Sequence, residues 1–204
     1  MKEREVTNMT YEQILEQKTL EARNNNLLQV RREYKKDWVQ EKIHSYCKRW
    51  DGKFTIAEIE ESILNNDIIA SMFAKDPSKQ NISEKLVGEI LNITKLPAVG
   101  KNCIRFTAEG DIVSNSGVNV SKSADFKIGD TYYTQKYTKE EGGAQDNQYN
   151  DVVDFLTKGS IKHKVGAILN GAYWHQRING LREYFRDNPN VHITNVDELR
   201  RNNE

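Results

Sequence analysis

The chain has 204 residues, with 30 Lys or Arg against 30 Asp or Glu, so its formal net charge at pH 7 is zero. A neutral chain has no overall attraction to nucleic acid or to an anionic membrane, and any site for a polyanion must be a local patch. Two widely separated cysteines, an N-terminus without an apolar segment, and the absence of any apolar run near the ~18 residues of a membrane span predict a cytoplasmic protein without membrane contact.

Residues 1–78 are predicted to form a helical subdomain that serves in DNA binding or dimerisation. A T-x-x-Q capping box at Thr10 opens a long run with few breakers, which predicts one long helix, or two helices parted near residues 24–26. A second capping box, Thr55 with Glu58, opens the run TIAEIEESILNNDIIASMFA, whose apolar spacing is helical. The sequence Asp-Pro-Ser at residues 76–78 then ends the subdomain.

The stretch from residue 26 to residue 50 is locally basic, with seven basic side chains against three acidic ones. On a helix, some of these cations lie on neighbouring faces, from which they would follow a DNA backbone. An ordinary solvated helix surface has the same composition. The candidate DNA contacts here are Arg31, Arg32, Lys35 and Lys36.

Residues 79–204 are predicted to form a second layer with the order αβββαβαβ. The first helix begins at Asn81 and carries Glu84 at the capping-box position. The runs that follow have strand length, which predicts an antiparallel meander: CIRFTA, DIVSN, ADFKIG and TYYTQKYT. After these we expect a helix over 145–157, a buried strand in KVGAILNG, a helix in YWHQRINGLREYFRDNP, a strand in VHITNV and a polar tail, DELRRNNE.

The two strands ADFKIG and TYYTQKYT carry an acid and a lysine that alternation places together. Side chains alternate along a strand, so Thr134 and Lys136 share a face, and a turn at Gly129-Asp130 brings Asp125 beside it. A carboxylate, an ammonium group and a backbone carbonyl that converge in this way suit magnesium-dependent phosphodiester hydrolysis. A surface ion pair at a sheet edge is the alternative interpretation.

These two strands resemble the D...(D/E)-x-K hairpin of the PD-(D/E)XK nuclease superfamily, and the order αβββαβ from Asn81 to Gly171 is similar to its core. The resemblance implies an α/β fold with a mixed central sheet flanked by helices, preceded here by the helical subdomain. The segments GGAQDNQYNDV and AILNGAYW look like parts of type II restriction endonucleases.

When the site residues of the family are matched by position to this sequence, the resemblance implies a catalytic lysine at Lys136 and a metal-binding aspartate at Asp125. The carbonyl of Gln135 would be a further metal ligand, and Glu89 would be the acidic ligand from the first core helix, with Glu84 as its competitor.

The sequence departs from the family pattern at two positions. Ala124 replaces a proline, and Thr134 replaces the second acid, so the site lacks one charge. Three possibilities follow from the missing charge. An acid from the helix replaces it, an acid from the glycine-rich loop (Glu140, Glu141 or Asp146) replaces it, or the site binds metal more weakly.

The loop after the lysine strand is the second candidate DNA contact. Glycines at residues 142–143 would let the backbone approach DNA, and polar side chains next to them would contact phosphates or bases. A plain turn with a helix cap is the alternative. The candidates are Gln145, Asn147 and Gln148.

The resemblance implies a type II site-specific endonuclease that cuts both strands of DNA with Mg²⁺ and leaves 5′-phosphate ends, as is usual in this family. A two-fold homodimer would match the symmetry of a symmetric DNA site. Two alternatives stay open: a structure-specific nuclease of repair or recombination with the same fold, and an inactive DNA-binding module, to which Thr134 gives some weight. A subunit that needs a partner chain is a third possibility.

Overall fold

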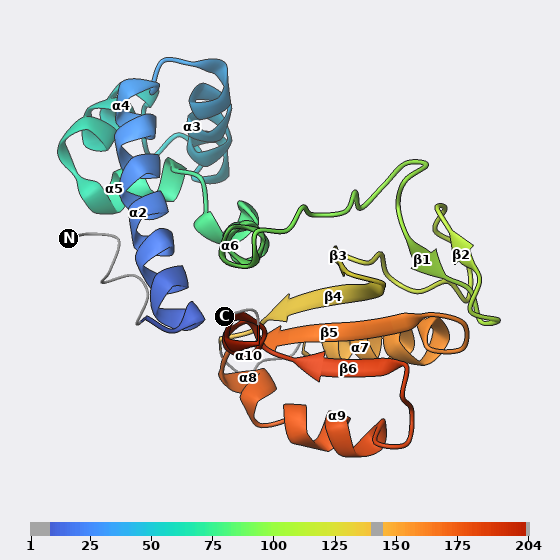
Figure 1. The fold of residues 1–204 in the computed structure, drawn as a ribbon. Coiled ribbons are helices and arrows are strands. Elements are labelled where there is room, and N and C mark those ends of the chain that lie inside the picture. Colours follow the sequence, from blue (N-terminus) through green and yellow to red (C-terminus); the bar gives the residue numbers. More distant parts are fainter. Residues whose placement is uncertain (1–8, 140–144, 203–204) are drawn as a thin grey trace. The chain divides into compact units, whose positions relative to one another are not determined.

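The computed structural model describes residues 9–139 and 145–202, and the contacts between residues divide them into two units (Figure 1). One unit runs from Gln13 to Ile82 and is helical. The other joins the described residues before Gln13 to those after Ile82 and contains the main sheet. The sequence placed the boundary at residue 78; the structure divides the chain after Ile82 and assigns the residues before Gln13 to the sheet unit.

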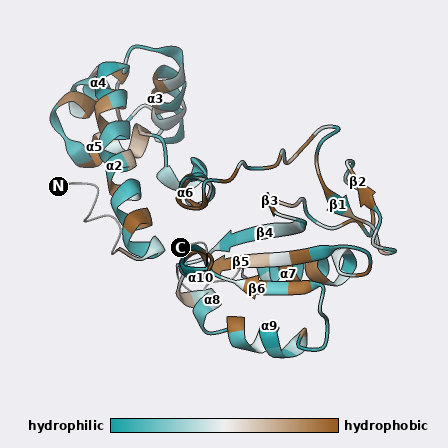
Figure 2. Ribbon diagram, in the orientation of Figure 1, coloured by the Kyte–Doolittle hydropathy of each residue, from teal (hydrophilic) through white to brown (hydrophobic). Residues whose placement is uncertain are grey.

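The helical unit is built from four α-helices and a short 3-10 turn around one core. The elements are α2 (Tyr11–Arg32), α3 (Asp37–Arg49), α4 (Ile56–Asn65), α5 (Asp67–Phe73) and η1 (Pro77–Lys79). Apolar residues of α2 to α5 form this core. Brown stretches in Figure 2 mark apolar residues on α4 and α5. Val30, Val39, Ile43 and Ile63 are fully buried there.

Two of the predicted helix boundaries in this unit are wrong. Helix α2 passes through residues 24–26 without a break, because Asn26 is buried and its amide donates to the carbonyl oxygen of Lys75. The break falls instead between Arg32 and Asp37. The capping box of Thr55 and Glu58 is confirmed, but the helix it opens ends early, because the Asn66 side chain caps α5.

The main sheet of the second unit has four strands and is mixed, as the family resemblance implied. Its strands, in spatial order, are β3 (Phe126–Ile128), β4 (Thr131–Tyr137), β5 (Lys164–Asn170) and β6 (Val191–Thr194). Strand β3 is antiparallel to β4, whereas β4, β5 and β6 are parallel to one another. Strand β5 is central and its residues from Val165 on are buried, which agrees with its continuous apolar run.

Helices flank this sheet, and two of them contact opposite faces of β4. Gln135 reaches Ser83 of α6 (Ile82–Leu91), whereas Thr138 reaches Gln148 of α7 (Gln145–Gly159), and residues of odd and even number on a strand face opposite ways. The main core lies between the sheet and three helices: α7, α8 (Ala172–His175) and α9 (Ile178–Tyr184). The last described helix is α10 (Val196–Arg201).

Three details of this unit differ from the sequence prediction. CIRFTA and DIVSN do not join the main sheet; they form a separate two-stranded ribbon of β1 (Arg105–Phe106) and β2 (Ile112–Val113). Phe106 explains this, since its buried ring packs on Phe155 of α7 instead of extending the sheet. The expected polar tail is α10, with Val196 and Leu199 buried, and the expected helix after β5 is broken into α8 and α9.

Candidate active site

The β3–β4 hairpin brings Asp125 beside Thr134, as the predicted turn and strand alternation require. Phe126 pairs with Tyr133 and Ile128 with Thr131, so the connection is a two-residue turn at Gly129-Asp130, where Gly129 has φ 58°. If the same register is extended by one residue before β3, Asp125 lies opposite Thr134. The contacts agree, because the Thr134 hydroxyl donates to Asp125 Oδ2 at 3.3 Å.

Asp125 is held by the strand that carries the lysine. The backbone N–H of Gln135 donates to Asp125 Oδ2 at 2.7 Å. Burial raises the pKa of the Asp125 carboxyl above its ordinary value, while the Gln135 N–H and the Lys136 ammonium act in the opposite direction. A carboxylate that is costly to ionise therefore lies within the electrostatic reach of Lys136.

A second carboxylate reaches the same region from α6. The charge of Glu84 raises the pKa of Asp125, and Glu84 forms an ion pair with Lys95, whose own charge lowers that pKa. Lys95 follows α6 and pairs with Phe126, beyond the edge strand β3. Lys95 is not among the predicted site residues, because the residues next to it in the sequence do not indicate that the chain after α6 runs beside β3.

Glu84 is therefore a helix acid whose charge acts on Asp125. Glu84 and Glu89 are five residues apart, about 140° around an α-helix, so their side chains point to different faces of α6. Glu89 is exposed on that helix. Its role as a metal ligand stays a prediction.

A buried polar chain on the opposite face of β4 fixes α6 relative to the lysine strand. The Gln135 side chain donates to Ser83 Oγ at 2.9 Å, and this hydroxyl lies 2.7 Å from the Tyr11 hydroxyl. Gln135 and Tyr11 are buried. Ser83 precedes Glu84 and Gln135 lies between Thr134 and Lys136, so this chain sets the position of the helix acid against the hairpin.

The donor set suits a hard divalent ion. Asp125 Oδ1 accepts no hydrogen bond from the described residues, so it is free for a cation, and Glu84 and the carbonyl of Gln135 would add two more oxygen ligands. Within residues 9–139 and 145–202 no group of three or more His, Cys, Asp or Glu could hold a metal ion. Magnesium often keeps several waters and needs only one or two carboxylates when a phosphate supplies another ligand.

The residues predicted to contact DNA beside the lysine strand have different surroundings. Gln148 is engaged inside the fold, where its Oε1 accepts from the Thr138 hydroxyl at 2.9 Å. Asn147 is exposed on the first turn of α7, as is the loop-side acid Asp146. The Gln145 side chain, the two glycines, Glu140 and Glu141 lie outside the described residues.

The four candidate cations of the helical unit all have carboxylate partners. Each ion pair places a carboxylate within 4 Å of the cation, and this negative charge weakens the attraction of the cation to a phosphate. The pairs are Arg31 with Asp67 at 2.5 Å, Lys35 with Glu60 at 2.6 Å, and Arg32 and Lys36 with Glu33 at 3.6 and 3.3 Å.

Comparisons with known proteins add no family to this geometry. No protein-family model, no curated protein and no solved structure matches the chain. Among the residues that the structure describes, no helix is long and apolar enough to cross a membrane.

Replacing Asp125 with asparagine should stabilise the metal-free protein. Because the fold raises the pKa of Asp125, the stability that its carboxyl contributes is complete below the ordinary value of 3.8 and is lost as pH rises through the folded value. Asparagine keeps the acceptor for the Gln135 N–H and removes the buried charge. At neutral pH we expect a gain of about 1 kcal/mol, or roughly 2 to 4 °C in the thermal midpoint.

Asp130→Asn in the same hairpin is the matched control, because Asp130 is exposed and its pKa is lowered by Lys164. Its midpoint should be unchanged or slightly lower. Calorimetry in EDTA between pH 4 and 8 measures both variants. If the thermal midpoint of Asp125→Asn at neutral pH is lower than that of the wild type, burial of the ionised Asp125 carboxylate does not destabilise the protein.

Proposed function

We propose that this chain is a Mg²⁺-dependent endonuclease of the PD-(D/E)XK kind, and that it cuts double-stranded DNA at specific sites as a type II restriction enzyme. The observation that carries the proposal is the hairpin, on which a buried Asp125 lies opposite Thr134 and within the electrostatic reach of Lys136. The mixed sheet, with helices on both faces of the strand that bears the lysine, is consistent with that fold.

Each residue of the site would have a distinct role. Asp125, Glu84 and the carbonyl of Gln135 would hold Mg²⁺, and we choose Glu84 over Glu89 because its charge acts on Asp125. Bound magnesium would supply a lowered pKa for a coordinated water and a polarised phosphoryl oxygen. Lys136 would orient the attacking water and offset the negative charge that develops on the phosphate.

Thr134 explains why the helix acid matters in this chain. The threonine hydroxyl is neutral and donates its hydrogen to Asp125, so it supplies no negative charge to the site. With Asp125 alone the site would attract a divalent ion weakly. Glu84 would restore the second charge from α6, and its ion pair with Lys95 keeps it close to Asp125 before the metal arrives.

As part of the same proposal, the enzyme acts in the cytoplasm as a homodimer, whose two-fold axis matches that of a symmetric DNA site. Each protomer would then cut one strand. The products would carry 5′-phosphate ends.

A plasmid digest tests the proposal. The purified full chain, incubated with several sequenced plasmids, should give fixed bands in Mg²⁺ and intact plasmid in EDTA. Cleavage confined to branched or flapped DNA would point to a structure-specific nuclease of the same fold. Binding without nicking at any Mg²⁺ concentration would identify an inactive DNA-binding module, the alternative to which the neutral Thr134 gives some weight.

A further inference from the structure

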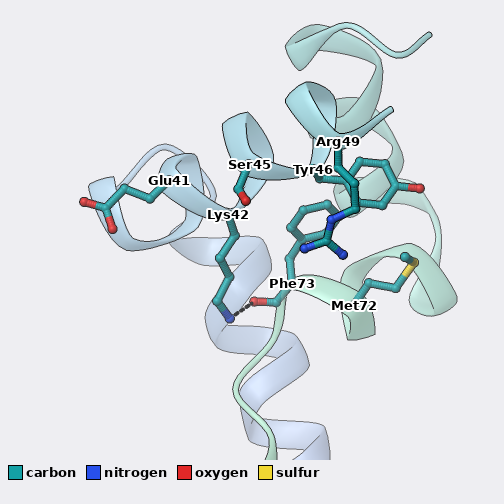
Figure 3. A pocket seen from close by; sticks show the side chains of 7 residues that line it. All are labelled: Glu41, Lys42, Ser45, Tyr46, Arg49, Met72 and Phe73. Carbon is teal, nitrogen blue, oxygen red and sulfur yellow. Dashed lines mark hydrogen bonds between the residues drawn. The ribbon is translucent and has the colours of Figure 1, made fainter. Parts of the chain in front are cut away.

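A hollow on the surface of the helical unit is lined by side chains of α3 and α5. Its volume is about 410 Å³. Lys42, Ser45 and Arg49 contribute from one side of α3, at a spacing that keeps them on one helix face, and Met72 and Phe73 contribute from α5 (Figure 3). The charged groups therefore lie on the α3 side together with the ring of Tyr46, and the α5 side is apolar.

The cations at and next to this hollow have no carboxylate partners among the described residues, in contrast to the four candidate cations discussed above. Lys42, Lys75 and Arg49 form no ion pair with any residue of 9–139 and 145–202. Glu41 also lines the hollow, but its carboxylate points away from the other six side chains (Figure 3). The positive charge here is therefore not neutralised within the described part of the chain.

Two further lysines, Lys75 and Lys79, lie close enough to Lys42 to repel its ammonium group. Lys42 and Lys75 each lie 5.2 Å from the centre of the Trp38 ring, and Lys42 donates to the carbonyl oxygens of Phe73 and Ala74 at the end of α5. Burial lowers the pKa of Lys42, and the charges of Lys75 and Lys79 lower it further. An anion bound here would relieve that repulsion.

We propose that this cationic face, formed by Lys42, Arg49, Lys75 and Lys79, binds the phosphate backbone of duplex DNA. Lys42 and Arg49 are seven residues apart, or roughly 10 Å along the helix axis, so they can contact separate phosphates of one duplex. The Arg49 guanidinium has no ion pair within the described part of the chain, so its fork is available to a phosphate. The identification of the anion as DNA rests on the proposed function. The cationic face replaces the four paired cations of α2 and the α2–α3 connection as the proposed contact surface.

Binding of a labelled 30-base-pair duplex, measured in EDTA so that no cleavage is needed, tests the face. The double variant Arg49→Ala/Lys75→Ala should bind about tenfold to a hundredfold more weakly at physiological salt. Its plot of log K against log salt concentration should be shallower by about 1.8, which is the loss of two phosphate contacts. The charge-preserving variant Arg49→Lys/Lys75→Arg should bind like the wild type.

Two further variants make the result specific. Lys162→Ala/Arg186→Ala removes the same charge from surface ion pairs of the sheet unit and should change affinity less than threefold. Arg32→Ala/Lys36→Ala removes the earlier candidates, and a larger loss there than at Arg49 and Lys75 would overturn the proposal. Circular dichroism melts establish that all variants are folded.

The outcomes separate this proposal from the nuclease function. Weaker binding by the Arg49/Lys75 variant, together with a wild type that never cuts DNA, would keep the cationic face and reject the nuclease. Unchanged binding together with normal wild-type cleavage would reject the face and keep the nuclease. A wild type that binds no duplex would also reject the face, and would leave an acidic protein as the ligand to examine.

Discussion

Replacing Lys136 with alanine should lower the rate of Mg²⁺-dependent DNA cleavage by about 10²- to 10³-fold, the effect of removing one preorganised electrostatic group from a reaction centre. Lys136 acts on the same hairpin face as Asp125, and its ammonium would stabilise the charge that forms on the phosphate. Affinity for duplex DNA in EDTA should change little, because the groups proposed to hold the backbone lie elsewhere. Single-turnover cleavage and equilibrium binding measure the two quantities.

Lys164→Ala is the matched control for this experiment. Lys164 is also a strand lysine of the main sheet, but its ammonium pairs with Asp130 at the turn of the hairpin. Its loss should leave the cleavage rate within about threefold, since exposed ion pairs contribute little. If Lys136→Ala cuts as fast as the wild type, Lys136 has no part in the chemistry, and the hairpin is a surface feature of the sheet.

The hairpin is the part of the site that the sequence predicted best, because its geometry follows from local rules. A two-residue turn fixes the register, and the register with strict alternation decides which side chains meet. Asp125, Thr134 and Lys136 therefore took their places from a dozen consecutive residues. Their mutual arrangement needed no knowledge of the rest of the chain.

The second acid could not be chosen from sequence, because the choice depends on how α6 is rotated against the sheet. Both Glu84 and Glu89 fit the helical pattern of α6. The rotation of α6 is set by the buried link from Ser83 to Gln135 and Tyr11, which joins residues far apart in the chain. Lys95, the partner of Glu84, was missed for the same reason.

The errors in the fold have a similar origin in tertiary contacts that override local preference. Asn26 does not end a helix, because its amide bonds to the carbonyl oxygen of Lys75. Phe106 belongs to a short ribbon because its ring packs on α7. The polar C-terminal segment is helical because Asn195 caps it and Val196 and Leu199 become buried. In each case the residue can be read from the sequence, but the tertiary contact that decides its structure cannot.

Glu84→Gln should impair cleavage far more than Glu89→Gln. If Glu84 supplies the charge that Thr134 lacks, its loss should lower the rate at low Mg²⁺ by about 10²-fold and raise the Mg²⁺ concentration needed for half-maximal rate, with partial recovery at high Mg²⁺. Both substitutions lie on α6 and remove one exposed or half-exposed carboxylate, so they are matched in helix propensity and net charge.

The expected result for Glu89→Gln is a cleavage rate and a Mg²⁺ dependence close to those of the wild type, because Glu89 lies on another face of α6. The opposite pattern, in which Glu89→Gln shifts the Mg²⁺ dependence and Glu84→Gln does not, would return the metal site to the acid first expected from the family pattern. Since the charge of Glu84 raises the pKa of Asp125, Glu84→Gln should also lower that pKa. A carboxyl resonance of Asp125, followed by NMR in metal-free solution, should therefore titrate at lower pH in Glu84→Gln and be unshifted in Glu89→Gln, which locates the helix acid independently of cleavage.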